Sequence, residues 1–180
     1  MVKNILDKLS QKSYESEEHI SRMVEYADLL GREIKLDPDK LIELWLLANF
    51  HDIGEVKISK NILTKTNKLT KKEWDKMKKH PREGYNIVKT VNRFSFVADK
   101  VLYHHEHWDG SGYPEGLSGE MIPILSRIIN IVDAYEVMIT ERPYSPAKSE
   151  KEALAELKKC SGSQFDPYLV EKFIKVMRSN

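Results

Sequence analysis

Residues 37–54 read DPDKLIELWLLANFHDIG, a stretch that joins a clear helix signal to two potential metal ligands. Asp37 suits the N-cap of a helix, and Pro38 suits its first position. Apolar residues then recur at helical spacing as far as about His51. The sequence therefore predicts a largely apolar helix that ends on an adjacent histidine and aspartate, His51 and Asp52.

Helical periodicity continues on both sides of this stretch, and no segment shows the convincing alternation of a half-buried strand. Thr70 and Glu73 have the spacing of a capping box, so a helix is expected to begin there. Residues 52–67 read as a loop with short turns, and the glycine-rich residues 106–122 read as a long loop. The prediction is an all-α fold in which residues 1–180 form a single helical domain. Helices are expected over residues 17–34, 38–51, 70–79, 94–105, 123–140, 149–159 and 166–177, with a further one that begins at Pro81.

The overall composition limits the classes of function. The 29 basic and 28 acidic side chains give a formal net charge of +1, so a large basic face for long nucleic acid is not expected, whereas a small phosphate ligand is compatible. The lone cysteine, Cys160, excludes an intramolecular disulfide. No apolar run reaches the roughly 18 residues of a membrane span, and the N-terminus lacks the apolar core of a signal peptide. These features favour a soluble cytoplasmic protein, or a domain cut from a longer one.

The six histidines are the second unusual feature of the chain. A single histidine at a helix end is more often a cap or a satisfied core residue than a ligand. Here, however, two adjacent pairs of ligand types occur, His51-Asp52 and His104-His105. Neighbouring helical residues diverge by about 100°, so both members of a pair reach one cluster only if it lies in the wedge between them. The pairs therefore favour a shared cluster near the ends of two helices.

Further residues of the same types occupy positions from which they can join this cluster. Glu15 and His19 are four residues apart on one expected helix face. Asp133 lies in the middle of an apolar helix, where its burial requires a salt bridge, a hydrogen bond or a metal ion. His80 precedes Pro81 at a helix junction. Each residue alone has an ordinary structural explanation, but their combination indicates a metal site.

Imidazole and carboxylate ligands without thiolate suit iron, manganese or zinc more than a structural zinc site. The candidates exceed the needs of one tetrahedral ion and suit two or three ions. Two ions about 3.5–4 Å apart can activate a water molecule and stabilise the leaving oxygen of a phosphodiester. The candidate metal ligands are Glu15, His19, His51, Asp52, His80, His104, His105 and Asp133.

The loop directly after the histidine pair offers a second functional element. Its closely spaced glycines let the backbone approach a ligand, and Trp108 and Tyr113 offer stacking faces for a base. The alternative is a tight surface turn with an aromatic plug. Turn chemistry alone leaves both interpretations open.

In their order along the chain these motifs resemble the HD-GYP domain family. The resemblance covers about residues 15–177, which is nearly the whole chain. It is specific, because a lone His-Asp pair would be a weak signal whereas this ordered set is a strong one. The matching segments are HDIG at 51–54, His80-Pro81, HHEHWDGSGYP at 104–114, Arg127-Ile128, Asp133, Arg142-Pro143-Tyr144 and Phe165-Asp166-Pro167.

The resemblance implies an activity and a metal content. HD-GYP proteins are bacterial phosphodiesterases that hydrolyse cyclic di-GMP to linear pGpG, and often on to GMP. Their fold is a helical bundle of the HD-domain type with two or three divalent metal ions in its core, and iron or manganese is expected here. The implied partners are a cyclic dinucleotide substrate and protein partners such as sensor or diguanylate cyclase domains.

The resemblance also implies roles for individual residues. All eight candidate ligands match metal-binding positions, and Glu15 matches the extra acidic ligand of three-metal members. Asp52 is implied as the catalytic residue, because it would bridge two metals and help to position a metal-activated hydroxide. The implied substrate-binding residues are Asp109, Gly112, Tyr113, Pro114 and Arg142.

Two departures from the family pattern concern substrate binding. Glu55 stands where the family usually has a lysine that contacts phosphate, and Ser145-Pro146 stands where basic residues often follow. Lys57 and Lys148 are nearby cations that could substitute for the missing ones. Three functions are therefore carried forward: a cyclic di-GMP phosphodiesterase, a catalytically weak binding or regulatory module, and an HD-type phosphohydrolase for another nucleotide.

Overall fold

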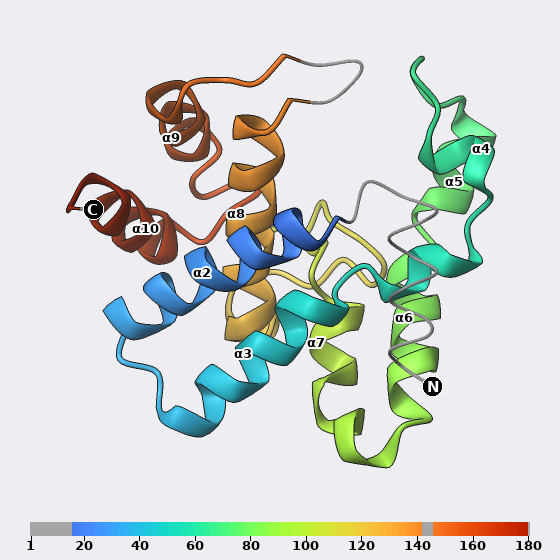
Figure 1. The fold of residues 1–180 in the computed structure, drawn as a ribbon, viewed down its shortest axis with the longest axis horizontal. Helices are drawn as coiled ribbons and strands as arrows, with labels where there is room; N and C mark the ends of the chain where they lie inside the picture. Colours follow the sequence, from blue (N-terminus) through green and yellow to red (C-terminus); the bar gives the residue numbers. More distant parts are fainter. Residues whose placement is uncertain (1–15, 142–145, 180) are drawn as a thin grey trace.

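The computed structural model describes residues 16–141 and 146–179, and these residues form a bundle of helices (Figure 1). Within these two ranges no β-strand forms, and the only extended pairings are two isolated bridges. The all-α prediction is therefore confirmed. None of the described helices combines the length and the apolar character that crossing a membrane requires. The elements are α2 (Glu17–Glu33), α3 (Pro38–Phe50), η1 (Ile53–Lys57), α4 (Lys60–Leu63), α5 (Lys71–Met77), α6 (His80–Lys89), η2 (Asn92–Val97), α7 (Ala98–Leu102), η3 (Gly119–Met121), α8 (Ile124–Ile139), α9 (Glu150–Lys159) and α10 (Pro167–Ser179).

Side-chain caps explain where several helices begin. The Asp37 carboxylate caps α3 by accepting a backbone hydrogen bond from its first turn at 2.9 Å. Thr70 and Glu73 form the predicted capping box at the start of α5. Ser149 and Glu152 form a second capping box, which opens α9. Local sequence thus determines these helix starts independently of the rest of the fold.

Helix α8 is the central element of the bundle. It packs against α2, α3, α7, α9 and α10, and Figure 1 shows it in the middle of the fold with α2 crossing it. Its Tyr135 is completely buried and contacts the ring of Phe173 from α10 edge to face, with 5.1 Å between the centroids. The Arg127 guanidinium donates to the Asp166 carboxylate at 2.6 Å, which connects α8 to the start of α10. Because so much of α8 is buried, each acidic side chain on it needs a partner inside the fold.

The helix expected over residues 94–105 is wrong in its extent. The structure has the 3-10 helix η2 followed by the short helix α7, which ends at Leu102. Apolar residues spaced three apart fit both kinds of helix, so periodicity could not distinguish them. Beyond Leu102, His104 Nδ1 donates to the Val101 carbonyl at 2.6 Å, and a continuing helix would need that carbonyl for the amide of His105. The two histidines therefore follow the helix instead of ending it.

Helices α4 and α5 form a hairpin at the edge of the bundle, away from α8 (Figure 1). Residues 52–67, expected to be a loop with short turns, contain η1 and α4. Ile58, Ile62 and Leu63 form a hydrophobic cluster that is separate from the main core and is covered by Leu69 and Met77. The hairpin leads through Lys78 and Lys79 into α6, which begins at His80.

Candidate metal centre

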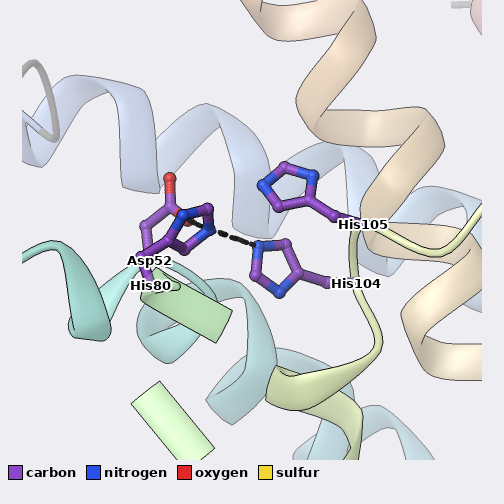
Figure 2. A group of neighbouring side chains, drawn as sticks. All are labelled: Asp52, His80, His104 and His105. Atoms are coloured by element: carbon purple, nitrogen blue, oxygen red, sulfur yellow. Dashed lines mark hydrogen bonds and ion pairs between the residues drawn. The ribbon is translucent and has the colours of Figure 1, made fainter. Parts of the chain in front are cut away.

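Four side chains from three separate segments meet at one point (Figure 2). Asp52 directly precedes η1, His80 is the first residue of α6, and His104 and His105 follow α7. One ligand atom from each of the four lies within 4.8 Å of the others. These residues form the first ligand group, which could hold a divalent cation.

A second ligand group lies beside the first. His19 comes from α2, His51 follows the last residue of α3, and Asp133 comes from α8. Their ligand atoms also lie within 4.8 Å of one another. His51 and His104, one from each group, contact edge to face with 5.6 Å between their ring centroids. Every predicted ligand within the described ranges therefore belongs to one of two adjoining groups.

Asp52 lies between the two groups. Its Oδ1 is 3.0 Å from His80 Nε2 and 3.3 Å from His104 Nε2. Its Oδ2 is 3.6 Å from His51 Nε2. Each carboxylate oxygen therefore faces a different group. A carboxylate placed in this way could bind one cation through each oxygen, an arrangement compatible with a two-ion site.

The backbone orients three of the histidines in the same way. The Nδ1 atoms of His51, His80 and His104 lie 2.9, 2.9 and 2.6 Å from the carbonyl oxygen three residues earlier. A carbonyl oxygen can only accept, so Nδ1 carries the proton and Nε2 keeps the lone pair that a cation needs. For His80 that carbonyl belongs to Met77, whose usual helical partner would be Pro81, a residue without an N–H. These imidazoles are therefore preset as Nε2 ligands.

A side chain orients His19 instead. His19 Nδ1 lies 2.5 Å from Glu136 Oε2, and the same carboxylate accepts hydrogen bonds from Arg22 and Thr140. Burial favours a higher pKa for Glu136, but His19 and Arg22 lower that pKa to about 2. A histidine held by a carboxylate through its other nitrogen is a common arrangement in metal sites. Glu136 was not predicted, although a second acidic residue three positions after Asp133 on an apolar helix was a usable signal.

The protonation states of the first ligand group suit metal binding. Burial favours a higher pKa for Asp52, but the neighbouring His51 and His80 hold that pKa well below its usual value. Burial lowers the pKa of His104 and lowers that of His105 even further. An ionised carboxylate and neutral imidazoles are the forms that bind a cation. Asp52, His104 and His105 are therefore in the protonation states that bind a metal at neutral pH.

One buried carboxylate holds the loop that follows the histidine pair. Glu106 accepts hydrogen bonds from the backbone amides of residues 115, 116 and 117 at distances of 2.7, 3.1 and 3.1 Å. Its backbone carbonyl accepts from the Asn130 side chain at 2.7 Å, which anchors the loop on α8. Gly112 packs so closely that an added Cβ would lie 2.2 Å from the His107 nitrogen. The sequence did not predict this role of Glu106. The close approach of the His107 backbone explains why position 112 needs a glycine.

Tyr113 lies against the first ligand group. Its ring centroid is 5.0 Å from that of His105, and its backbone amide donates to the His105 carbonyl at 3.2 Å. Burial raises the pKa of the Tyr113 hydroxyl, and the negative charges of Asp52, Asp133 and Glu55 raise it further. The hydroxyl is therefore a neutral hydrogen-bond donor beside the ligands. Glu55 is buried in η1, where it adds negative charge to the surroundings of the site.

Two other residues of the loop serve its structure. Asp109 is exposed, and its carboxylate accepts a hydrogen bond from the Ser111 amide at 2.9 Å. The Arg127 guanidinium lies over the ring of Trp108, 5.6 Å from the centroid, and covers one of its faces. Of the two aromatic residues expected to offer stacking faces, only Tyr113 thus contacts a histidine of the first ligand group.

The remaining predicted residues are Pro114, Glu15 and Arg142. Pro114 is partly buried and is joined to Tyr113 by a cis peptide bond. Glu15 and Arg142 lie outside the described residues, so their roles as a metal ligand and a substrate contact stay predictions. Lys57 and Lys148, the cations considered as substitutes for the family's basic residues, are both exposed.

The two ligand groups together can hold two adjacent divalent cations. Both offer nitrogen and oxygen atoms without sulfur, a set that suits iron, manganese or zinc. Histidine and carboxylate ligands in this number leave coordination positions for water and for phosphate oxygens. The chemistry that such a centre supports is hydrolysis of a phosphoester.

Comparisons with known proteins agree with this geometry. The family model described as HD domain matches residues 1–169. The cyclic di-GMP phosphodiesterase response regulator RpfG of Xanthomonas campestris is 37% identical over 158 residues, which are 87% of this chain and 42% of that protein. The cyclic di-GMP phosphodiesterase of Thermotoga maritima is 35% identical over 178 residues, which are 97% of this chain and 48% of that protein.

A solved structure shares the fold. It is the crystal structure of V-cGAP3, a cyclic GMP-AMP specific phosphodiesterase of Vibrio cholerae, with a TM-score of 0.72 at 22% identity. The match covers 97% of this chain and 46% of that chain. The chain thus spans less than half the length of these relatives. The similarity is to one part of each longer protein.

Proposed function

The chain belongs to the HD domain family and carries the motifs of the HD-GYP type, and from this premise we propose that it is a metal-dependent phosphodiesterase that hydrolyses cyclic di-GMP. The bond cleaved is a phosphodiester of the cyclic dinucleotide. The product is linear pGpG or, after a second cleavage, GMP. We also propose that residues 1–180 act as one catalytic domain, which in the cell works with sensor or diguanylate cyclase domains.

The observation that carries the proposal is the position of Asp52. Its Oδ1 faces His80 and His104, whereas its Oδ2 faces His51, so one carboxylate connects both ligand groups. A structural single-metal site has no need of a second group or of a bridging acid. Adjacent sites with open coordination positions are what a two-ion phosphodiesterase requires.

The protein's own residues provide orientation and a hydrogen-bond donor. Bound divalent cations, with iron or manganese proposed, supply activation of a water molecule and neutralisation of phosphate charge. His51, His80 and His104 need no reorientation for binding, because backbone carbonyls hold their Nδ1 atoms. The neutral Tyr113 hydroxyl can donate to a phosphate oxygen as its charge grows in the transition state.

A second function is favoured by one observation, the carboxylate of Glu55. It is buried and lies close enough to Tyr113 to raise the pKa of that hydroxyl. A negative charge there opposes the binding of a dianionic dinucleotide. The second candidate is therefore a module that retains its metals but turns over slowly.

A substrate panel tests the proposal. The full chain, loaded with manganese(II) or iron(II), is incubated with cyclic di-GMP, 3′3′-cGAMP and cyclic di-AMP, and kcat/KM is measured for each. The proposal expects cyclic di-GMP to be the best substrate and the rate to vanish with chelator. A preference for one of the other two nucleotides would change the proposed substrate but leave the proposed reaction, phosphodiester hydrolysis, unchanged. Cleavage of none of the three by folded, metal-loaded protein would favour the binding module.

A further inference from the structure

The segment before His80 is strongly basic. Residues 57–82 contain ten basic and two acidic side chains, whereas the chain as a whole contains 29 and 28. The segment comprises the α4–α5 hairpin and the start of α6. Lys65 on the hairpin pairs with Glu73 at 2.6 Å. Lys68 is exposed and has no ion-pair partner in the part of the chain that the structure describes.

The hairpin also carries an exposed aromatic side chain close to the metal centre. Trp74 of α5 is 46% exposed. Its ring contacts that of Tyr113 edge to face, with 6.3 Å between the centroids and 78° between the planes. Tyr113 in turn contacts His105 of the first ligand group. A single ring therefore separates an accessible indole from a predicted metal ligand.

A cavity of about 340 Å³ lies between α4 and α5. Trp74, Leu69 and Met77 supply apolar lining, and Asn67 and Lys68 supply polar groups. The volume is at the lower end of the range for small-molecule sites, which begins at about 300 Å³. An aromatic ring, an amide and a cation match the base face, the base edge and the phosphate of a nucleotide.

We propose that the α4–α5 hairpin is a nucleobase subsite of the metal centre. In this subsite Trp74 stacks on one guanine of the cyclic dinucleotide, and Lys68 faces the phosphate that is not being cleaved. The inference rests on the proposed function, because it adds substrate-binding residues to the same site. The family resemblance implies a phosphate-contacting lysine at the position where this chain has Glu55. In the proposed subsite, Lys68 supplies a positive charge in place of that lysine.

The test compares two phosphodiesters with the manganese-loaded full chain. One is cyclic di-GMP, and the other is bis(4-nitrophenyl) phosphate, which has no guanine. Trp74→Ala is expected to raise KM for cyclic di-GMP about tenfold or more, the range that loss of one stacked base produces. Its kcat should change little, and Trp74→Phe should recover most of the affinity. Lys68→Ala should raise KM less, by an amount that shrinks at high salt.

Matched controls lie elsewhere on the surface. Trp45 of α3 is 51% exposed, and Lys151 of α9 is exposed. Trp45→Ala and Lys151→Ala should leave KM for cyclic di-GMP within about twofold of wild type, the spread usual for surface substitutions. Cleavage of the small diester should fall far less in Trp74→Ala than cleavage of cyclic di-GMP.

Two results would overturn the subsite. One is an equal KM for cyclic di-GMP in Trp74→Ala and Trp45→Ala. The other is an equal loss of cleavage activity toward both substrates in Trp74→Ala, which would indicate a structural role for Trp74. If the wild-type protein cleaves neither diester, the proposed function fails separately. In that case calorimetric titration of the same proteins with cyclic di-GMP tests the subsite by binding alone. Weaker binding by Trp74→Ala than by Trp45→Ala supports the subsite. Equal binding by the two variants, or no binding by any of the proteins, overturns it.

Discussion

His19 Nδ1 lies 2.5 Å from Glu136 Oε2, and the Glu136 carboxylate is completely buried behind the second ligand group. The two residues are 117 positions apart in the sequence and come from α2 and α8. The contact fixes the ring orientation of one predicted ligand, so substitutions at Glu136 should change the affinity of the centre for metal.

Glu136→Gln should weaken metal binding about 10- to 100-fold, the loss typical when a residue that orients a ligand is changed. The amide keeps the shape of the side chain but removes the charge that holds the imidazole. Competition with a chelating dye measures the affinity. Asp28→Asn, a change at a half-buried acidic residue of α2 that pairs with Arg32, is the control and should bind metal as wild type does. Equal affinities in the two variants would contradict the role of Glu136.

Metal loading should stabilise the fold, because both ligand groups exist only in the folded chain. At a metal concentration about 100 times Kd the gain is about 2.7 kcal/mol, which raises Tm by roughly 5–10 °C for a chain of this size. Thermal unfolding with manganese(II), and again with excess chelator, measures the shift. His104→Ala removes a ligand of the first group only, so it should reduce the shift, whereas His107→Ala, whose Nδ1 contacts Ser111 instead, should keep all of it. A shift in His104→Ala as large as that of the wild-type protein would contradict metal binding at the first ligand group.

Gly54→Ala should damage the site through the backbone. An added Cβ would lie 1.9 Å from the His80 carbonyl oxygen and 2.4 Å from the Gly84 nitrogen, so η1 and α6 would have to move apart. We expect a loss of about 1–3 kcal/mol in unfolding free energy, together with weaker metal binding. Urea denaturation and the dye competition measure the two effects. At Gly31 the new Cβ would meet the end of the Leu41 side chain, so Gly31→Ala should spare metal binding.

Glu55→Lys should strengthen substrate binding. The change replaces a negative charge near Tyr113 by a positive one, and we expect KM for cyclic di-GMP to fall about tenfold, a difference of about 1.4 kcal/mol. Glu55→Gln should give an intermediate value and controls for the burial of the side chain. Steady-state kinetics at several salt concentrations measures both. An unchanged KM in the two variants would mean that Glu55 does not face the substrate, and would remove the reason for a weak binding module.

The helices could largely be predicted because their signals are local. The Asp37 cap, the Thr70–Glu73 box and the apolar stripe of α8 each depend on residues within a few turns. The region 94–105 was mispredicted because a histidine side chain, bonded to a backbone carbonyl, competes with the helix there. Periodicity carries no information about such a competition.

That the candidate ligands gather in the fold could also be predicted, but the residues that orient them could not. His51, Asp52, His104 and His105 stand out as adjacent pairs in the sequence. In contrast, Glu106 acts through amides on a loop that closes back on it, an arrangement that becomes visible only when the chain is folded. The Trp74–Tyr113 contact likewise joins two segments that are unrelated by sequence spacing.

The measurement that tests the central claim most directly is chromatography of the products formed from cyclic di-GMP by anaerobically purified protein with added iron(II) or manganese(II). We predict the appearance of pGpG or GMP, no product with chelator, and none above background from a folded Asp52→Ala variant, since that change removes the carboxylate between the two ligand groups. No product from the metal-loaded wild-type protein, or undiminished product from Asp52→Ala, would contradict the account.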